Sequence, residues 1–500
     1  MTTTDAAPAE KVLTSVDPAS GATLATYPIA DDDDVRAAVA TARKAAETWA
    51  ALDFDERRKA LLRWSSRLVA DSDEFCALIH AENGKPLDDA FLELMLALEH
   101  IAWAAKHAKK VLAPKKISPG ALMSNFSARL EHRPLGVVGV IGPWNYPVYT
   151  PNGSIAYALA AGNTVVFKPS EYSTGIGNFL AEAFTKANPD LPKGVFATIN
   201  GYGATGAALV RAGVDKIAFT GSPGTGRKIM AAAADSLTPV LLECGGKDAV
   251  IVAADADVKA AADAVAWGAT SNSGQTCAGV ERVYVHRSVR EEFVAEVRRI
   301  LADVKPGAEA GANYGPMTMP SQVDIVRRHI DDAIAKGATA VVGGPESVKA
   351  PFIEPVVLLD APEDSAAVKE ETFGPTMTIR TVDSVDEAIA LANDSSYSLG
   401  SAVYSRKQGL EIARRLRAGA TSVNSVLGFA AIPGLPFGGS GDSGIGRIHG
   451  EQGLREFVSP HSIAIQRFSI PGMALLSYSR TQSTMKLLRR LVPVLHGRHK

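Results

Sequence analysis

Residues 216–234, KIAFTGSPGTGRKIMAAAA, place a glycine-rich turn between an apolar run and an alanine-rich segment. The run KIAF predicts a buried strand, and the segment that begins at Arg227 predicts a helix. The free N–H groups of the turn and of the helix start would suit a pyrophosphate. The spacing fits the common G-x-G-x-x-G pattern poorly, so this motif alone is weak evidence for nucleotide binding.

Further apolar runs flank this stretch and alternate with segments rich in small residues. They are VVGVI (137–141), TVVFK (164–168), PVLLE (239–243), AVIVA (249–253), RVYVH (282–286), ATAVVGG (338–344), GSAVYS (400–405) and ATSVN (420–424). Continuous apolar runs between helices are typical of a parallel sheet that is covered on both faces. Residues 31–110 instead show helical periodicity. The sequence therefore predicts an α/β fold class, with two α/β units that meet near residues 243–246.

The composition excludes several functional classes. The 500 residues include 52 Lys plus Arg and 54 Asp plus Glu, whereas a nucleic-acid-binding protein usually carries a basic excess. The three cysteines, at positions 76, 244 and 277, form neither a disulfide framework nor a zinc pattern. No stretch approaches the roughly 20 apolar residues that cross a bilayer. We expect a cytoplasmic protein that binds no nucleic acid and no metal.

The last thirty residues, 471–500, differ from the rest because they combine basic and apolar side chains. The basic residues are Lys486, Arg489, Arg490, Arg498 and Lys500, and they lie among Leu487, Leu488, Leu491 and Val492. This pattern is that of an amphipathic helix, which could make peripheral contact with an anionic membrane surface. A helix packed on the protein itself or on a partner subunit, and a frayed tail, are the alternatives.

Three residues have the chemistry of a covalent catalytic site. Cys277 lies among small residues in NSGQTCAG (272–279), where a substrate could approach a thiolate closely, although a single cysteine is more often an inert core residue. Glu243 ends the run PVLLE beside a glycine pair, and partial burial would raise its pKa toward that of a general base. Asn145, in the proline-stiffened loop GPWNYP (142–147), offers uncharged N–H donors to an oxyanion.

A second pair of polar residues follows the run VVFK. Lys168 closes that run, and Glu171 comes three residues later. At the carboxyl edge of a parallel sheet, both side chains can form hydrogen bonds with an adenosine ribose.

Together these motifs resemble the aldehyde dehydrogenase superfamily in order and approximate spacing. The matching segments are GPWNYP, FKPSE, FTGSPGTG, LLECGGKD, GQTCAG, EETFGP and LPFGGSGDSGIGR, and the resemblance covers about residues 12–468. It implies that Cys277 is the nucleophile, that Asn145 binds the oxyanion and that Glu243 activates the hydrolytic water. It also implies cofactor contacts for Trp144, Lys168, Glu171, Gly221, Ser222, Gly226, Glu371 and Phe373.

The resemblance further implies how the chain is divided. We expect a Rossmann-like NAD-binding domain from residues 1–115 and 135–244, and an α/β catalytic domain from residues 245–436. Residues 116–134 and 455–470 would form a small β arm that joins subunits into a homodimer or homotetramer. Residues 471–500 would form a basic C-terminal extension.

The implied activity is oxidation of an aldehyde to the carboxylic acid through a thiohemiacetal and a thioester on Cys277. A CoA-acylating enzyme and a catalytically silent binding protein are the alternatives, and Glu243 argues against the first. The cofactor would be NAD, with NADP less favoured, because the Glu171 carboxylate repels a 2′-phosphate.

The family's entrance tunnel corresponds to Tyr146, Tyr149, Gly153 and Phe429. Gly153 replaces a bulky aromatic residue of many relatives, so we expect it to leave room for the substrate. Cys244 and Gly441 depart from the usual family motifs, and the sequence assigns no role to Cys244.

Overall fold

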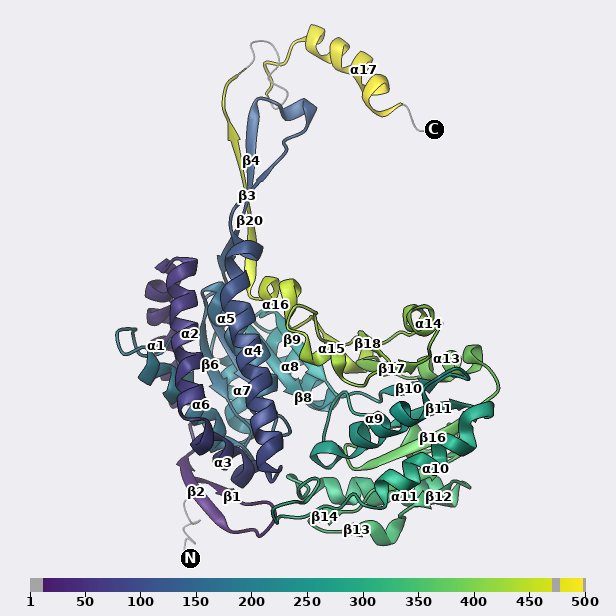
Figure 1. Ribbon diagram of the computed structural model, residues 1–500. Coiled ribbons are helices and arrows are strands. Elements are labelled where there is room, and N and C mark those ends of the chain that lie inside the picture. The colour runs from purple at the N-terminus through teal and green to yellow at the C-terminus, as the bar shows by residue number, and fades with distance from the viewer. Residues whose placement is uncertain (1–11, 470–476, 498–500) are drawn as a thin grey trace, which may run out of the picture. The chain divides into compact units, whose positions relative to one another are not determined.

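The computed structural model describes residues 12–469 and 477–497, so parts of the predicted extension, including Arg498 and Lys500, lie outside the described residues. The chain forms two compact units. The larger unit contains Met1–Val111 and Pro134–Phe457, and the smaller contains Leu112–Arg133 and Val458–Lys500. Figure 1 labels the elements of both units.

The larger unit contains a six-stranded sheet with the order β19-β9-β8-β5-β6-β7. Its strands are β5 (Val137–Ile141), β6 (Thr164–Lys168), β7 (Phe196–Thr198), β8 (Lys216–Gly221), β9 (Val240–Cys244) and β19 (Gly444–Ile445). All neighbouring strands are parallel except β19, which pairs antiparallel with β9. Every residue of β5 and β6 is buried, as expected for strands covered on both faces.

Helices surround this sheet. They are α1 (Asp32–Ala51), α2 (Phe54–Ala70), α3 (Ser72–Asn83), α4 (Leu87–Leu112), α5 (Tyr149–Ala161), α6 (Thr174–Ala187), α7 (Gly203–Arg211), α8 (Pro223–Ala234) and α16 (Gly450–Glu456). Asp31 and Asp53 cap α1 and α2, because each side chain accepts hydrogen bonds from N–H groups of the first turn. Val35 of α1 and Leu209 of α7 pack in one core cluster with Ile217 of β8.

A seven-stranded sheet with the order β12-β15-β16-β11-β10-β17-β18 forms the rest of this unit. Its strands are β10 (Ala249–Val252), β11 (Arg282–His286), β12 (Thr339–Val342), β15 (Val356–Leu359), β16 (Thr376–Val382), β17 (Gly400–Tyr404) and β18 (Ala420–Val423). Only β12 is antiparallel, and it lies at one edge. The accompanying helices are α9 (Val258–Thr270), α10 (Arg290–Leu301), α11 (Gln322–Ala335), α12 (Ala366–Lys369), α13 (Val385–Asn393), α14 (Gly409–Arg415) and α15 (Gly428–Ala431).

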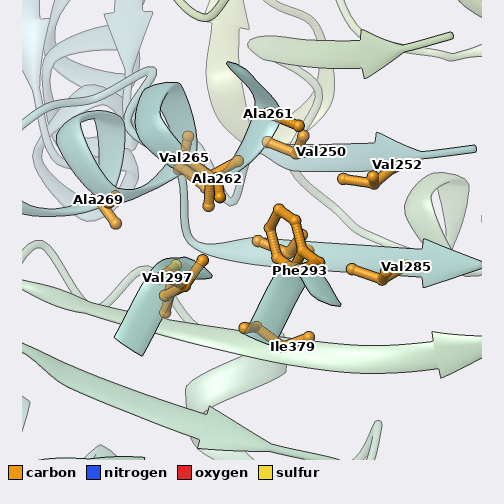
Figure 2. Packing of buried hydrophobic residues seen from close by; sticks show 14 of the residues in the cluster. Val250, Val252, Ala261, Ala262, Val265, Ala269, Val285, Phe293, Val297 and Ile379 are labelled. Atoms are coloured by element: carbon orange, nitrogen blue, oxygen red, sulfur yellow. The ribbon is translucent and has the colours of Figure 1, made fainter. Parts of the chain in front are cut away.

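The core of this second sheet is aliphatic with a central aromatic ring, as Figure 2 shows. Phe293 and Val297 of α10 and Val265 of α9 pack over Val285 of β11 and Ile379 of β16, and all five side chains are buried. Burial of aliphatic and aromatic side chains at this density is the main stabilising contribution in such a layer. The predicted α/β fold class is confirmed.

Two short hairpins complete the larger unit. The strands β1 (Val12–Val16) and β2 (Thr23–Pro28) pair antiparallel, and so do β13 (Val348–Lys349) and β14 (Phe352–Ile353).

The smaller unit has a three-stranded sheet with the order β20-β4-β3. Its strands are β3 (Lys115–Ile117), β4 (Phe126–Pro134) and β20 (Val458–Gln466), and the helix α17 (Gln482–His496) follows them along the chain. Within the described residues, no helix is both long and apolar enough to cross a membrane, and no group of three His, Cys, Asp or Glu side chains could hold a metal ion.

Candidate active site

The chain passes from the six-stranded sheet to the seven-stranded sheet between β9 and β10, over residues 245–248 alone. Side chains would not fit in the first half of this crossing. A Cβ on Gly245 would collide with the Glu371 carboxylate, and a Cβ on Gly246 would collide with the carbonyl oxygen of Cys277. The glycine pair therefore lets three segments of the site approach one another closely.

Glu243 lies in β9 just before this crossing. Its side chain is buried, and neither carboxylate oxygen has a hydrogen-bond partner among the described residues. Burial raises the pKa of Glu243 well above its usual value; Arg447 opposes this shift and Glu456 adds to it. A raised pKa makes the Glu243 carboxylate a stronger base, and its unpaired oxygens leave it able to accept a proton from a water molecule.

Cys277 follows a tight turn at the end of α9. The 3-10 segment Ser271–Gly274 contains Asn272 and Ser273 with left-handed φ values of 51° and 60°. The Asn272 side chain stabilises this backbone by donating to the carbonyl oxygens of Asn145, at 3.0 Å, and Gln275, at 3.2 Å. Burial raises the pKa of the Cys277 thiol, and the carboxylates of Glu371, Asp248 and Glu243 add to this shift.

Asn145 contacts the cysteine loop directly. Its side-chain nitrogen donates to the carbonyl oxygen of Gln275 at 2.9 Å, and the residue is buried. One hydrogen of this amide makes that bond, so the second remains for an oxyanion. The Gln275 side chain in turn accepts from Thr318 N at 2.9 Å and fixes the loop from the other side.

A buried ion pair that the sequence analysis missed holds the Asn145 loop. Lys85 pairs with Glu93, and its ammonium group also donates to the Asn145 carbonyl oxygen at 3.0 Å. Glu93 accepts from the backbone N–H groups of Val148, at 2.8 Å, and Tyr149, at 3.0 Å, where α5 begins. The two partners lie outside the quoted motifs, and only the fold brings them beside the loop.

A second buried pair holds the segment of Glu371 and Phe373. Lys247 pairs with Glu281, whose carboxylate accepts from the backbone N–H groups of Thr372 and Phe373. Gly246 N donates to Glu371 at 2.9 Å. Burial raises the pKa of Glu371 to about 8, Glu281 adds to the shift, and the Gly246 N–H opposes it. Lys247 lies in the quoted motif LLECGGKD. Its partner Glu281 lies 34 residues later and outside the quoted motifs, so the sequence did not indicate this pair.

A groove of about 850 Å³ runs along the carboxyl ends of the parallel strands β5, β6 and β8. Seven of the eight predicted cofactor residues line it, namely Trp144, Lys168, Glu171, Gly221, Ser222, Glu371 and Phe373, and so do Asn145, Glu243 and Cys277. The ammonium nitrogen of Lys168 lies 3.5 Å from a carboxylate oxygen of Glu171. Ser222 caps α8, because its hydroxyl accepts from Thr225 N at 3.3 Å.

Gly226, the eighth predicted cofactor residue, does not line the groove. A Cβ at this position would lie 3.1 Å from the Cys244 sulfur, so this glycine allows close packing of α8 on β9.

An apolar cavity of about 330 Å³ reaches Cys277 and Glu243 as well. Tyr146 and Tyr149 line it, as predicted for tunnel residues. Their hydroxyl groups are engaged, Tyr146 with Thr276 at 3.1 Å and Tyr149 with the Ala430 carbonyl oxygen at 2.7 Å.

The structure does not bring Gly153 and Phe429 into this cavity. A Cβ on Gly153 would lie 2.6 Å from the His449 ring, so the absent side chain makes room for that histidine and not for a substrate. Burial and the neighbouring His100 lower the pKa of His449 well below its usual value. Phe429 is buried and packs against Phe437, which lines the cavity in its place.

Comparisons with known proteins identify the family and the fold of this chain. The model of the aldehyde dehydrogenase family matches residues 4–463. The 4,4'-diapolycopene aldehyde oxidase of a Methylomonas species is 38% identical over 92% of this chain and 87% of its own length. A putative succinate-semialdehyde dehydrogenase [NADP(+)] of Mycolicibacterium smegmatis is 34% identical over 98% of this chain and 95% of its own. The crystal structure of an Escherichia coli lactaldehyde dehydrogenase superposes with a TM-score of 0.87 at 31% identity, over 92% of this chain and 96% of that one.

We predict that Gly246→Ala lowers turnover by at least about tenfold, because the new methyl group would push the Cys277 backbone away from its place. Overpacking of this kind also costs typically about 1–3 kcal/mol of stability. Gly224→Ala is the matched control for stability, since a Cβ there meets no atom within 4 Å. Steady-state rates of the Gly246 variant and urea unfolding of both variants check this. Wild-type turnover of the Gly246 variant, with the same unfolding midpoint as the control, would contradict the close approach of Gly246 to Cys277.

Proposed function

The chain belongs to the aldehyde dehydrogenase family, and we propose that it oxidises an aldehyde to the carboxylic acid through a covalent intermediate on Cys277. The observation that carries this proposal is the meeting of two cavities at Cys277 and Glu243. The polar groove and the apolar cavity share these two residues in their linings, together with Cys244 and Thr220. An aldehyde that enters by one side would therefore meet a redox cofactor that enters by the other.

The residues of the groove fit NAD or NADP, the cofactors that members of this family use. The groove offers the start of α8 for a pyrophosphate and the Lys168–Glu171 pair for ribose hydroxyl groups. Glu371, which lines the groove and accepts a hydrogen bond from Gly246 N, would bind the second ribose. Phe373, with its ring 5.4 Å from that of Trp144, would pack beside the nicotinamide. When bound, the cofactor supplies the acceptor for the hydride.

The reaction would begin at the Cys277 sulfur. The thiol gives its proton to solvent water, and the thiolate attacks the aldehyde carbon to form a thiohemiacetal. The oxygen that becomes negative would accept hydrogen bonds from the free N–H of Asn145 and from the Cys277 backbone. Because the Asn145 loop is clamped by Lys85 and Glu93, this donor is oriented before the substrate arrives. Loss of the hydride leaves a thioester on the sulfur.

Glu243 would complete the reaction. Its carboxylate takes a proton from a water molecule, which attacks the thioester carbon, and the carboxylic acid leaves as the thiol re-forms. Among the described residues its two oxygens have no hydrogen-bond partner, so a water can bind to them. Release of the acyl group to CoA would not need this base.

The cofactor preference would be set by Glu171. A 2′-phosphate about 4 Å from this carboxylate would cost roughly 1 kcal/mol in water and about 4 kcal/mol at an effective dielectric constant near 20. Lys168 offsets part of this repulsion. We propose that the enzyme prefers NAD to NADP, acts as a homodimer or homotetramer, and works in the cytoplasm.

Cys277→Ala should lower turnover by at least about 10³-fold, because no thiohemiacetal can form without the sulfur. NADH production from an aldehyde, measured with and without CoA, checks this. Cys244→Ala is the control and should stay within about threefold of wild type. Turnover of the Cys277 variant within tenfold of wild type would refute the assigned nucleophile.

Glu243→Gln should slow hydrolysis of the thioester more than hydride transfer. Stopped-flow absorbance is expected to show a stoichiometric burst of NADH followed by slow turnover. Because the pKa of Glu243 is raised and the base must be deprotonated, wild-type turnover should fall as the pH drops through that pKa. A variant without a burst, and with a crippled first turnover, would place this base at an earlier step.

Wild-type enzyme should favour NAD over NADP by about one to two orders of magnitude in kcat/KM, at roughly 1.4 kcal/mol per decade. Glu171→Gln should narrow this gap, chiefly by lowering KM for NADP. Glu182→Gln, a change to an exposed carboxylate outside the groove, should leave the ratio unchanged. Equal use of both cofactors by the wild type would contradict the role of Glu171.

Sedimentation of the full chain at micromolar concentration tests the proposed assembly. We expect a dimer or a tetramer, and a monomer would exclude both.

A further inference from the structure

The surface that the apolar cavity presents to a ligand is mostly apolar. Its aliphatic and aromatic side chains come mostly from α4, α9 and residues 426–431, with Phe437 and Ile448. They include Leu92, Met95, Leu96, Trp267, Val426 and Leu427. The hydroxyl groups of Tyr146 and Tyr149 already have partners in the protein.

The charged groups of the lining offer nothing to a second carboxylate. Among the described residues that line the cavity, Lys85 is the only cation. It is buried, and it is paired with Glu93 and bonded to the Asn145 carbonyl oxygen. Asp89 adds a carboxyl group to the lining, and it would repel an anionic substrate.

The apolar surface continues to the outside. Leu92, Met95 and Trp267 line the cavity and are nevertheless 47%, 43% and 53% exposed, so they stand at its mouth. Large apolar side chains that are half exposed at the entrance of a cavity provide a surface that a long substrate can cover. An aldehyde shorter than the cavity would leave these three side chains in water.

We propose that the substrate is a long, uncharged aldehyde, whose apolar chain fills the cavity and covers Leu92, Met95 and Trp267. This inference rests on the proposed function, since it requires the aldehyde carbon to lie at Cys277. The selectivity would come from apolar contact along the chain, with exclusion of carboxylates by Asp89 and by the lack of a free cation.

A series of straight-chain aldehydes from propanal to decanal tests the substrate class, with succinate semialdehyde as the anionic comparison. Each methylene buried is expected to raise kcat/KM about fourfold, which is 0.8 kcal/mol at 1.4 kcal/mol per decade. Succinate semialdehyde should be the poorest substrate of its length. A kcat/KM that is constant or falls with chain length, or that is highest for succinate semialdehyde, would overturn the substrate class. It would leave the proposed reaction intact. Failure of every aldehyde would instead refute the proposed function.

A variant at the mouth makes the test specific. Met95→Lys should lower kcat/KM for decanal at least about tenfold and leave the value for propanal within about twofold, because only the longer chain reaches this side chain. Val69→Lys, a change at a half-exposed position of α2 that does not line the cavity, is the matched control. Equal loss for both aldehydes, or no loss for decanal, would contradict the proposed path of the chain.

A separate observation concerns α17 in the smaller unit. Its helical spacing places Lys486, Arg489 and Arg490 on one face and a set of apolar residues on the other. The apolar set is Leu487, Leu488, Leu491, Val492 and Val494, and four of these are 37–64% exposed. The sequence has no acidic residue after Glu456, so the cations of α17 meet no opposite charge within this C-terminal stretch.

We infer that α17 lies on an anionic bilayer, with its apolar face inserted and its basic face toward the lipid headgroups. A face of this kind could also pack on a second copy of the chain, but a segment with basic residues alone would repel its own copy. Each basic side chain near an anionic surface contributes about 1 kcal/mol, which is about fivefold in partitioning. The apolar face and the basic face of α17 therefore both contribute to binding the anionic bilayer.

Flotation of the full chain with vesicles of phosphatidylcholine and phosphatidylglycerol tests this, with pure phosphatidylcholine vesicles as the comparison. We expect binding to the anionic vesicles that weakens about 100-fold when Lys486, Arg489 and Arg490 are changed to Gln, about 3 kcal/mol at 1.4 kcal/mol per decade. Leu487→Asp with Leu491→Asp should also abolish binding, without changing turnover of propanal. Binding that is equal on both vesicle types, or unchanged in either variant, would overturn the inference. Loss of oligomerisation in the variants without vesicle binding by the wild type would assign the face to a protein contact instead.

Discussion

The short crossing between β9 and β10 is the constraint on which the rest of the site depends. Only residues 245–248 separate a strand of one sheet from a strand of the other, so Glu243 and the loop of Cys277 are forced together. Gly245 and Gly246 have no room for a Cβ, so only glycine fits at these two positions. The backbone N–H of Gly246 also donates a hydrogen bond to the Glu371 carboxylate. Lys247, the next residue, anchors Glu281 and through it the Thr372–Phe373 backbone. One four-residue connection thus organises the base, the nucleophile and one wall of the groove.

The price of this arrangement is desolvation of several ionisable groups. Burial raises the pKa values of Glu243, Glu371 and the Cys277 thiol, so the free site favours their neutral forms. Two buried lysine–glutamate pairs, Lys85–Glu93 and Lys247–Glu281, remain fixed and hold backbone N–H groups and carbonyl oxygens in place. Removing one partner of such a pair is far more costly than the pair itself is stabilising, because an unpaired charge would remain buried. Among the described residues, the Glu243 carboxylate oxygens have no hydrogen-bond partner, whereas the two lysine–glutamate pairs that position the site are paired.

Much of the fold could be predicted from local patterns. The runs 137–141, 164–168 and 282–286 are the strands β5, β6 and β11, because a strand buried on both faces must be apolar throughout. The antiparallel direction of β12 could not be predicted, since pairing direction depends on the connection and not on composition. Motif resemblance indicated most of the groove, yet it could not show that Gly226 serves helix packing or that His449 occupies the space beside Gly153. The partners of Lys85 and Lys247 were also hidden, because buried pairs depend on contacts that only the tertiary structure creates.

Mass spectrometry of the quenched enzyme shows directly whether Cys277 carries the acyl group. The wild-type chain would be mixed with NAD and an aldehyde, acid-quenched within the first turnover, and digested. The account predicts an added acyl mass on the peptide that contains Cys277 and on no peptide that contains Cys76 or Cys244. An adduct on either of the other two cysteines, or product formation without any adduct at Cys277, would contradict it.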